Sequence, residues 1–178
     1  MEISLSKSKL TRGLVASIIF VLMGFWLLTY EPTESNPIFN YPFVKYVAAI
    51  ASILFFGFGT FYFSRKLTDK KPGIVIDDEG ITDNSSAVAV GLIPWSDIKQ
   101  LAKAKVMKQE FIIIVVNNPE YYLSQQTSFL KKKGMKYNYN NYGSPLAISA
   151  NGLKCNLKEL TIILERKLSE YKSKVGPY

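Results

Sequence analysis

The chain has 178 residues, of which 48% are hydrophobic and 20% are charged. Its formal net charge of +8 favours an anionic membrane surface or a nucleic acid as a partner. The absence of histidine excludes Ser-His-Asp and Cys-His catalysis and histidine metal sites, and a single cysteine excludes an intramolecular disulfide. We interpret that residue, Cys155, as a small buried side chain rather than a nucleophile, because no histidine exists to activate it.

Two apolar stretches near the N-terminus are long enough to cross a bilayer. Residues 13–30 contain no charged side chain, and residues 46–63 form a second stretch of the same kind. A helix of this length spans roughly 27 Å, which is close to the ~30 Å hydrocarbon core of a membrane. Residues 31–44 contain three prolines and are interpreted as a turn outside the membrane. The sequence therefore predicts a transmembrane helical hairpin over residues 13–63.

Basic side chains flank this hairpin on one side. They are Lys7, Lys9, Arg12, Arg65, Lys66, Lys70 and Lys71. The turn on the other side carries Glu31 and Glu34, with Lys45 at its edge. The positive-inside rule then places the N-terminal segment 1–12 and the C-terminal part in the cytoplasm, beneath the cell inner membrane. A cleaved signal peptide is the alternative for the first stretch, but its apolar run is long and lacks a small-residue cleavage pattern.

The remaining residues predict an α+β domain over 72–173, after a charged linker at 65–71. Short β-prone runs follow one another in this part of the chain, at 74–77, 81–83, 87–93, 98–106, 110–116, 136–142, 145–149 and 153–155. The turn at 78–80 is predicted to place Gly80 at a positive φ. Pro94 is expected to end the strand that precedes it.

Two helices are predicted among these strands. The first covers 118–133, because an N-cap candidate, a proline and an acid open it, and Gly134 is expected to end it. The second begins at Asn156, where Glu159 three residues later forms a capping-box pattern. Its apolar face comprises Leu157, Leu160, Ile163, Leu164, Leu168 and Tyr171. A bent antiparallel sheet with an inserted helix and a C-terminal helix has the layout of a pleckstrin-homology (PH) domain.

Four segments of the chain are also similar to a known family. They are Pro72–Ile76, Gly80–Ser86, Gly91–Ile98 and Gly143–Pro145. In these segments the chain resembles small bacterial membrane proteins that have a two-helix transmembrane hairpin and a bacterial PH-like domain. The resemblance implies a fold and a location, and it brings no activity with it. The acidic turn Asp77–Glu79 departs from PH domains that bind phosphoinositides through basic side chains, so that ligand is not expected there.

Two groups near the predicted first strands were weighed as sites. Trp95 and Asp97 form a structural motif that could line a pocket, but we interpret Trp95 as a core residue and Asp97 as a turn cap. Four acids could hold a hard cation, although turn chemistry explains them better because they lack the spacing of a calcium loop. These acids are Asp77, Asp78, Glu79 and Asp83.

The densest basic cluster is the candidate for lipid contact. It consists of Lys131, Lys132, Lys133 and Lys136, and it is followed by three tyrosines. These side chains are suited to anionic headgroups, and less well to RNA. The competing interpretation is that the lysines complement the dipole at a helix C-terminus and face solvent.

The sequence therefore predicts a membrane-anchored, non-enzymatic interaction module that binds a protein or peptide, with auxiliary contact to membrane lipids. It predicts no cofactor, no metal and no nucleic-acid partner, and it leaves a homo-oligomer open. The alternative is an immunity or stress protein that acts through its hairpin, for example against a membrane-targeting toxin. An enzyme is the third class, and no acid/base pair in the sequence favours it.

Overall fold

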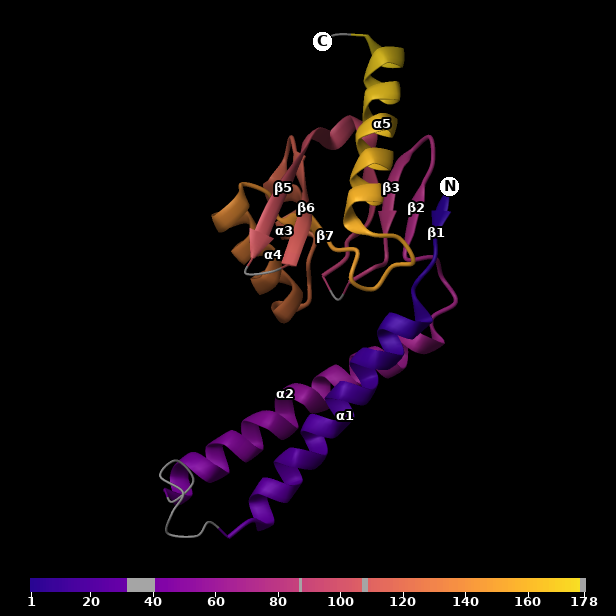
Figure 1. Ribbon diagram of the computed structural model, residues 1–178. Coiled ribbons are helices and arrows are strands. Elements are labelled where there is room, and N and C mark those ends of the chain that lie inside the picture. Colours follow the sequence, from indigo (N-terminus) through magenta and orange to yellow (C-terminus); the bar gives the residue numbers. More distant parts are fainter. Residues whose placement is uncertain (32–40, 87, 107–108, 177–178) are drawn as a thin grey trace. The chain divides into compact units, whose positions relative to one another are not determined.

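The chain forms two units in the computed structural model, which describes residues 1–31, 41–86, 88–106 and 109–176 (Figure 1). One unit is the helical hairpin of residues 7–70. The other, called the domain below, combines residues 1–6 with residues 71–178. The domain is a mixed α+β structure of antiparallel sheets with a C-terminal helix.

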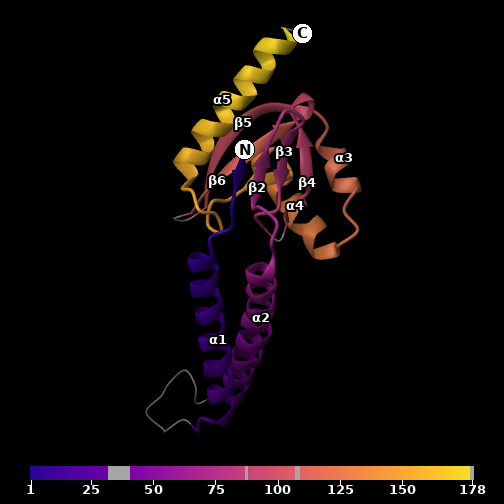
Figure 2. The ribbon, with the colours of Figure 1, turned by 90° about the vertical axis from the view of Figure 1, so that its right-hand side faces the viewer.

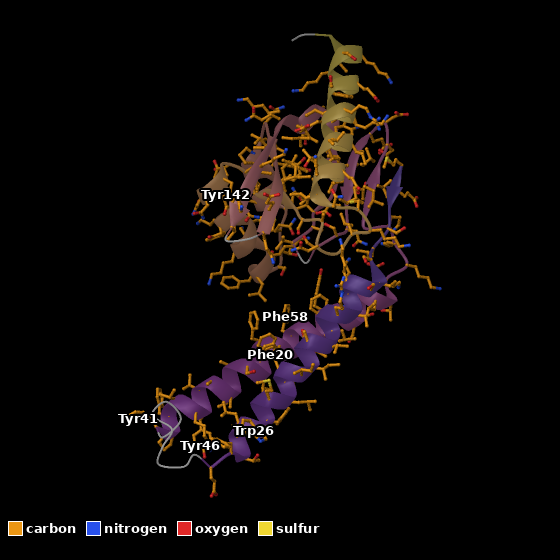
Figure 3. The ribbon with its side chains drawn as sticks, in the orientation of Figure 1. Phe20, Trp26, Tyr41, Tyr46, Phe58 and Tyr142 are labelled. Carbon is orange, nitrogen blue, oxygen red and sulfur yellow. The ribbon has the colours of Figure 1, made fainter. Side chains whose placement is uncertain are left out.

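The hairpin consists of helix α1, Lys7–Thr29, and helix α2, Pro42–Thr68. Both are long and apolar enough to cross a membrane by length and composition. Small residues let them approach closely, since a Cβ on Gly24 would lie 3.1 Å from the Ala49 carbonyl oxygen. The rings of Phe20 and Phe56 stack with centroids 4.3 Å apart. Other large apolar side chains of the hairpin project outward (Figure 3).

Both helices are longer than the sequence predicted. Helix α1 starts six residues earlier, at Lys7, whose ammonium group donates to the Leu67 carbonyl. Helix α2 starts at Pro42, because proline is tolerated in a first helical turn, and it continues to Thr68. The predicted turn at 31–44 is therefore wrong from Pro42 onward, and residues 32–40 lie outside the described part of the chain. Lys45 is buried inside α2 and donates to the Tyr30 carbonyl at 2.8 Å.

The domain contains two antiparallel sheets, and Figure 2 shows strands β2, β3 and β4 side by side. The first sheet has the order β1-β2-β3-β4 and consists of Glu2–Ile3, Ile74–Ile76, Gly80–Asp83 and Gly91–Pro94. A 3-10 helix, Trp95–Asp97, connects it to the second sheet. The second sheet has the order β5-β6-β7 and consists of Ile98–Val106, Gln109–Val116 and Leu146–Ile148.

The N-terminal strand β1 belongs to the domain, whereas the sequence predicted residues 1–12 as a separate segment. Ile3 pairs with Ile74 in β2, and the Met1 amino group donates to the Ile76 carbonyl at 2.7 Å. Leu5 forms an isolated bridge with Leu153. Ile3 and Leu5 are buried, so the first six residues complete the core of a domain whose other strands begin some seventy positions later. A two-residue strand carries no periodic signal that could reveal this pairing.

The core lies between β6, the first sheet and helix α5, Leu157–Val175 (Figure 1). The β-branched residues Ile112, Ile113 and Ile114 are buried in β6, as their continuous run predicts. Helix α5 begins with the predicted capping box: the Asn156 side chain accepts from the Glu159 amide, and the Glu159 carboxylate accepts from the Asn156 amide.

Gly80 is required for a different reason than the one predicted. Its φ is not positive; the positive values belong to Gly91, Gly143 and Gly176 among the described residues. A Cβ on Gly80 would lie 2.1 Å from the Ile93 carbonyl oxygen in β4. The glycine is therefore fixed by the close approach of two paired strands rather than by turn geometry.

The predicted helix at 118–133 is in fact two helices. Helix α3 covers Pro119–Ser124, and helix α4 covers Phe129–Tyr142 and passes through Gly134. The predicted strand at 136–142 is therefore wrong. Its tyrosines favour a strand by local propensity, but burial of Met135 on one side of α4 stabilises the helix instead. Gly143 ends α4 in the left-handed conformation, with φ of 73°.

Candidate binding groove beside helix α5

A large hollow of the domain lies where the C-terminal half of α5 passes the beginning of β5. Its volume is about 850 Å³. A second hollow of about 270 Å³ shares Ser169 and Lys172 with it and extends along β5 to Gln100 and Leu101. We call the two hollows together the α5 groove. The larger one is lined by Trp95, Ser96, Ile98, Lys99, Asn117, Ser169, Tyr171, Lys172, Ser173, Val175 and Gly176.

Trp95 forms the aromatic floor of this groove. It follows Pro94 at the end of β4, and its side chain is buried, as the sequence predicted. The indole Nε1 donates to the Asp77 carbonyl at 2.9 Å, which satisfies the one polar group of the ring. The Tyr171 ring of α5 lies 6.5 Å from the Trp95 ring between centroids, at 29°. Two elements that are far apart in sequence thus place a pair of aromatic rings at the groove.

Asp97 is held by a partner that sequence reasoning did not identify. Its carboxylate accepts a hydrogen bond from the Tyr122 hydroxyl at 2.7 Å, which ties α3 to the 3-10 helix. Burial, and then the hydrogen bond from the hydroxyl to Asp97, raise the pKa of Tyr122 well above its ordinary value. The Asp97 side chain therefore does not act as the simple turn cap that we expected, and this pairing makes it a structural acid.

Among its described lining residues the groove has two lysines, Lys99 and Lys172, and one acid, Glu165 in the smaller hollow. A bulge between Ile98 and Gln100 leaves Lys99 without a partner residue in β6. The Lys172 ammonium group donates to the Lys99 carbonyl at 2.7 Å, across 73 positions of sequence. Among the described lining residues of the larger hollow none is acidic. A ligand that presents an apolar side chain and a carboxylate has complementary groups here.

The predicted lipid-contact lysines lie elsewhere, on α4. Lys132, Lys133 and Lys136 are exposed, and Lys131 is half-buried. They occupy the first two turns of the helix, so the competing interpretation is wrong about a helix C-terminus, while its exposed face holds for Lys132, Lys133 and Lys136. At this end the helix dipole disfavours positive charge.

Several of the other predicted residues have structural partners. Of the basic flanks, Lys7, Lys9 and Arg12 begin α1, and Arg65 and Lys66 end α2, where Lys66 pairs with Asp69 at 3.1 Å. Lys70 and Lys71 follow α2. The carboxylates of Asp77 and Asp83 accept backbone amide hydrogens two or three residues onward, which is turn chemistry.

Residues 1–31, 41–86, 88–106 and 109–176 contain no group of three or more His, Cys, Asp or Glu side chains placed to hold a metal ion. Cys155 is half-buried. No family model matches the chain, and neither a curated protein nor a solved structure matches it.

Proposed function

We propose that this protein is a membrane-anchored, non-enzymatic binding module with a PH-like domain. Helices α1 and α2 span the cytoplasmic membrane, and the domain binds a protein or peptide segment in the α5 groove on the cytoplasmic side. The observation that carries this proposal is the groove itself, with its aromatic floor and its two lysines. The two antiparallel sheets and the C-terminal helix support a PH-like fold.

The connections between the two units support a domain that works at the membrane. Only residues 4–6 separate β1 from α1, and only residues 69–73 separate α2 from β2. A chain extends by at most ~3.6 Å per residue, so both tethers are short. A hairpin that crosses the bilayer twice has both tethers on the same face. The pairing of β1 with β2 in one sheet requires the same, because both tethers lead into one domain. The basic side chains at that end favour the cytoplasmic face.

The groove favours an extended segment that carries an aromatic or aliphatic residue next to an acidic one. The apolar side chain would contact the Trp95 and Tyr171 rings, and the carboxylate would pair with Lys99 and Lys172. Within the described strands β5 pairs with β6 alone, so its other edge offers backbone groups to such a segment.

Fluorescence of Trp95 tests this proposal in the full-length protein in lipid nanodiscs. The chain has two tryptophans, and Trp26→Phe leaves Trp95 as the only reporter. A panel of short peptides that pair an aromatic with acidic residues should produce a saturable change in its emission. Lys172→Glu should weaken the binding about tenfold or more, since it reverses the charge at the groove. Lys158→Glu, on an exposed position of α5 outside the groove, should leave binding unchanged. Absence of any response across the panel, or equal affinity in Lys172→Glu, contradicts the proposal.

A further inference from the structure

The outer face of α4 combines exposed apolar side chains with lysines. Phe129 is 76% exposed, Leu130 66% and Tyr137 58%. Phe129, Lys133, Lys136 and Tyr137 follow a spacing of four, seven and eight residues, which places them on one side of a helix. The opposite side holds Met135, which is fully buried. We call the outward set the α4 face: Phe129, Leu130, Lys132, Lys133, Lys136 and Tyr137.

Lys132 and Lys136 line a hollow with Glu120 of α3, but no ion pair between them is formed in the described part of the chain. Within the described residues none of the lysines of the α4 face forms an ion pair. The first turn of α4 contains no acid, whereas α3 and α5 carry Glu120 and Glu159 there. Lys132, in the first turn of α4, opposes the helix dipole, and large apolar side chains lose free energy when they are exposed to water. Both features are satisfied together by a surface that is apolar and negatively charged.

We propose that the α4 face docks on the anionic surface of the membrane that holds the hairpin. Phe129 and Leu130 enter the boundary between headgroups and acyl chains, Tyr137 lies at headgroup level, and the three lysines contact lipid phosphates. Each lysine strengthens the contact roughly fivefold by its attraction to anionic lipid. This inference rests on the proposed anchoring by the hairpin, because the tethers keep the domain at the bilayer, and it is independent of what the α5 groove binds.

A fluorophore on α4 tests the docking in full-length protein. The background is Cys155→Ser, and the dye is attached to Asn141→Cys, an exposed position near the end of α4, or to Lys158→Cys on α5 as the control. Nanodiscs contain brominated lipid as the quencher, in either neutral or about one-third anionic bilayers. Since the hairpin is embedded in both, a difference between the two bilayers reports docking rather than anchoring. We expect at least twofold stronger quenching at position 141 in the anionic nanodiscs, and no such difference at position 158.

Two variants separate the lysines from the apolar side chains. Lys132→Glu/Lys133→Glu/Lys136→Glu should reduce quenching at position 141 to its neutral-bilayer value, and added salt should reduce it in the parent protein. Phe129→Ser/Leu130→Ser should reduce it also at low salt. The substituted side chains are exposed, so the urea midpoint should stay unchanged. Equal quenching in both bilayers, or undiminished quenching in the lysine variant, overturns the inference. Quenching at position 141 that requires an acidic protein rather than anionic lipid also overturns the inference. Peptide binding reported by Trp95 should survive in both variants, which separates this test from that of the groove.

Discussion

The hairpin leaves most of its large apolar side chains exposed, whereas the domain keeps most of its own inside. Leu54 in α2 is 69% exposed, and Leu164 in α5 is fully buried. The same residue type thus suits two environments: the protein interior within the domain and, under the proposed anchoring, lipid around the hairpin. The first turn of α4 is the most marked exception, because Phe129 and Leu130 are the most exposed of the described large apolar residues in the domain, ahead of Tyr137 and Ile162. That exception is the reason to look for a membrane contact of the domain.

The largest expected difference between the two units comes from replacing one leucine by alanine in each of them. Leu164→Ala should lower the free energy of unfolding of the domain by about 2–5 kcal/mol, because it removes buried methyl groups and leaves a cavity. Leu54→Ala should change it by less than about 0.5 kcal/mol, as expected of a side chain outside any core. Urea unfolding in detergent micelles, followed by Trp95 emission in the Trp26→Phe background, measures both. Similar losses from the two variants would show that the two units do not differ in this way.

Glycines provide the second test. Gly80→Ala should cost about 3 kcal/mol, the upper end for overpacking, because the new Cβ would lie 2.1 Å from a backbone carbonyl that cannot move without breaking the sheet. Gly57 in α2 has open space around it, since nothing lies within 4 Å of an added Cβ. Gly57→Ala should therefore be neutral, or should stabilise the helix slightly. Thermal unfolding of the two variants measures both effects. A Gly80→Ala variant with unchanged stability would contradict the close approach of β3 and β4.

The same contrast explains what could be predicted from sequence. The two long helices could be predicted from their uninterrupted apolar composition. Strand β6 could be predicted from its continuous apolar run, and helix α5 from its capping box. All of these signals are local in sequence. The N-terminal strand could not be predicted, because Ile3 becomes a core residue only by pairing with Ile74. Only the beginning of helix α4 was predicted as helix, because the tyrosines of its second half favour a strand, and packing of Met135 outweighs that preference.

The groove was not predicted from sequence, for a related reason. Burial of Trp95 could be inferred from its place after Pro94 in a β-rich stretch. Its partners could not, because Tyr171 carried only the periodicity of a helix face and Lys172 reaches Lys99 across 73 positions. Likewise nothing in the neighbourhood of Asp97 in sequence indicates Tyr122. Sites that are assembled from distant elements leave little trace in any one segment.

Tyr122 allows a smaller test that depends on pH. Tyr122→Phe should cost about 1.5 kcal/mol at neutral pH, the low end for a hydrogen bond to a charged group, because the bond to Asp97 is only partly buried. The raised pKa of Tyr122 means that the folded state favours the protonated hydroxyl. Its contribution is therefore complete below the unfolded tyrosine pKa of ~10 and declines as the pH rises above that value.

The advantage of the parent protein over Tyr122→Phe should accordingly shrink above about pH 10. Urea unfolding across alkaline pH measures the difference, in which the titration of other groups cancels. Tyr46→Phe, at an exposed position of the hairpin, serves as the control and should show neither the loss nor the pH dependence. A constant difference across this range would contradict the pairing of Tyr122 with Asp97.

Helix ends provide the smallest test. Tyr41, the N-cap of α2, makes no side-chain cap hydrogen bond. The N-cap of α5, Asn156, forms a reciprocal pair of hydrogen bonds with Glu159. The first backbone amides of a helix have no acceptor within the helix, so a side chain that accepts from them stabilises the helix start. Asn156→Ala should therefore cost about 1 kcal/mol. Ser128, the N-cap of α4, makes no side-chain cap hydrogen bond, so Ser128→Ala is a matched control with a smaller expected effect. Equal losses would mean that the capping box contributes nothing specific and that α5 is held by its buried leucines alone.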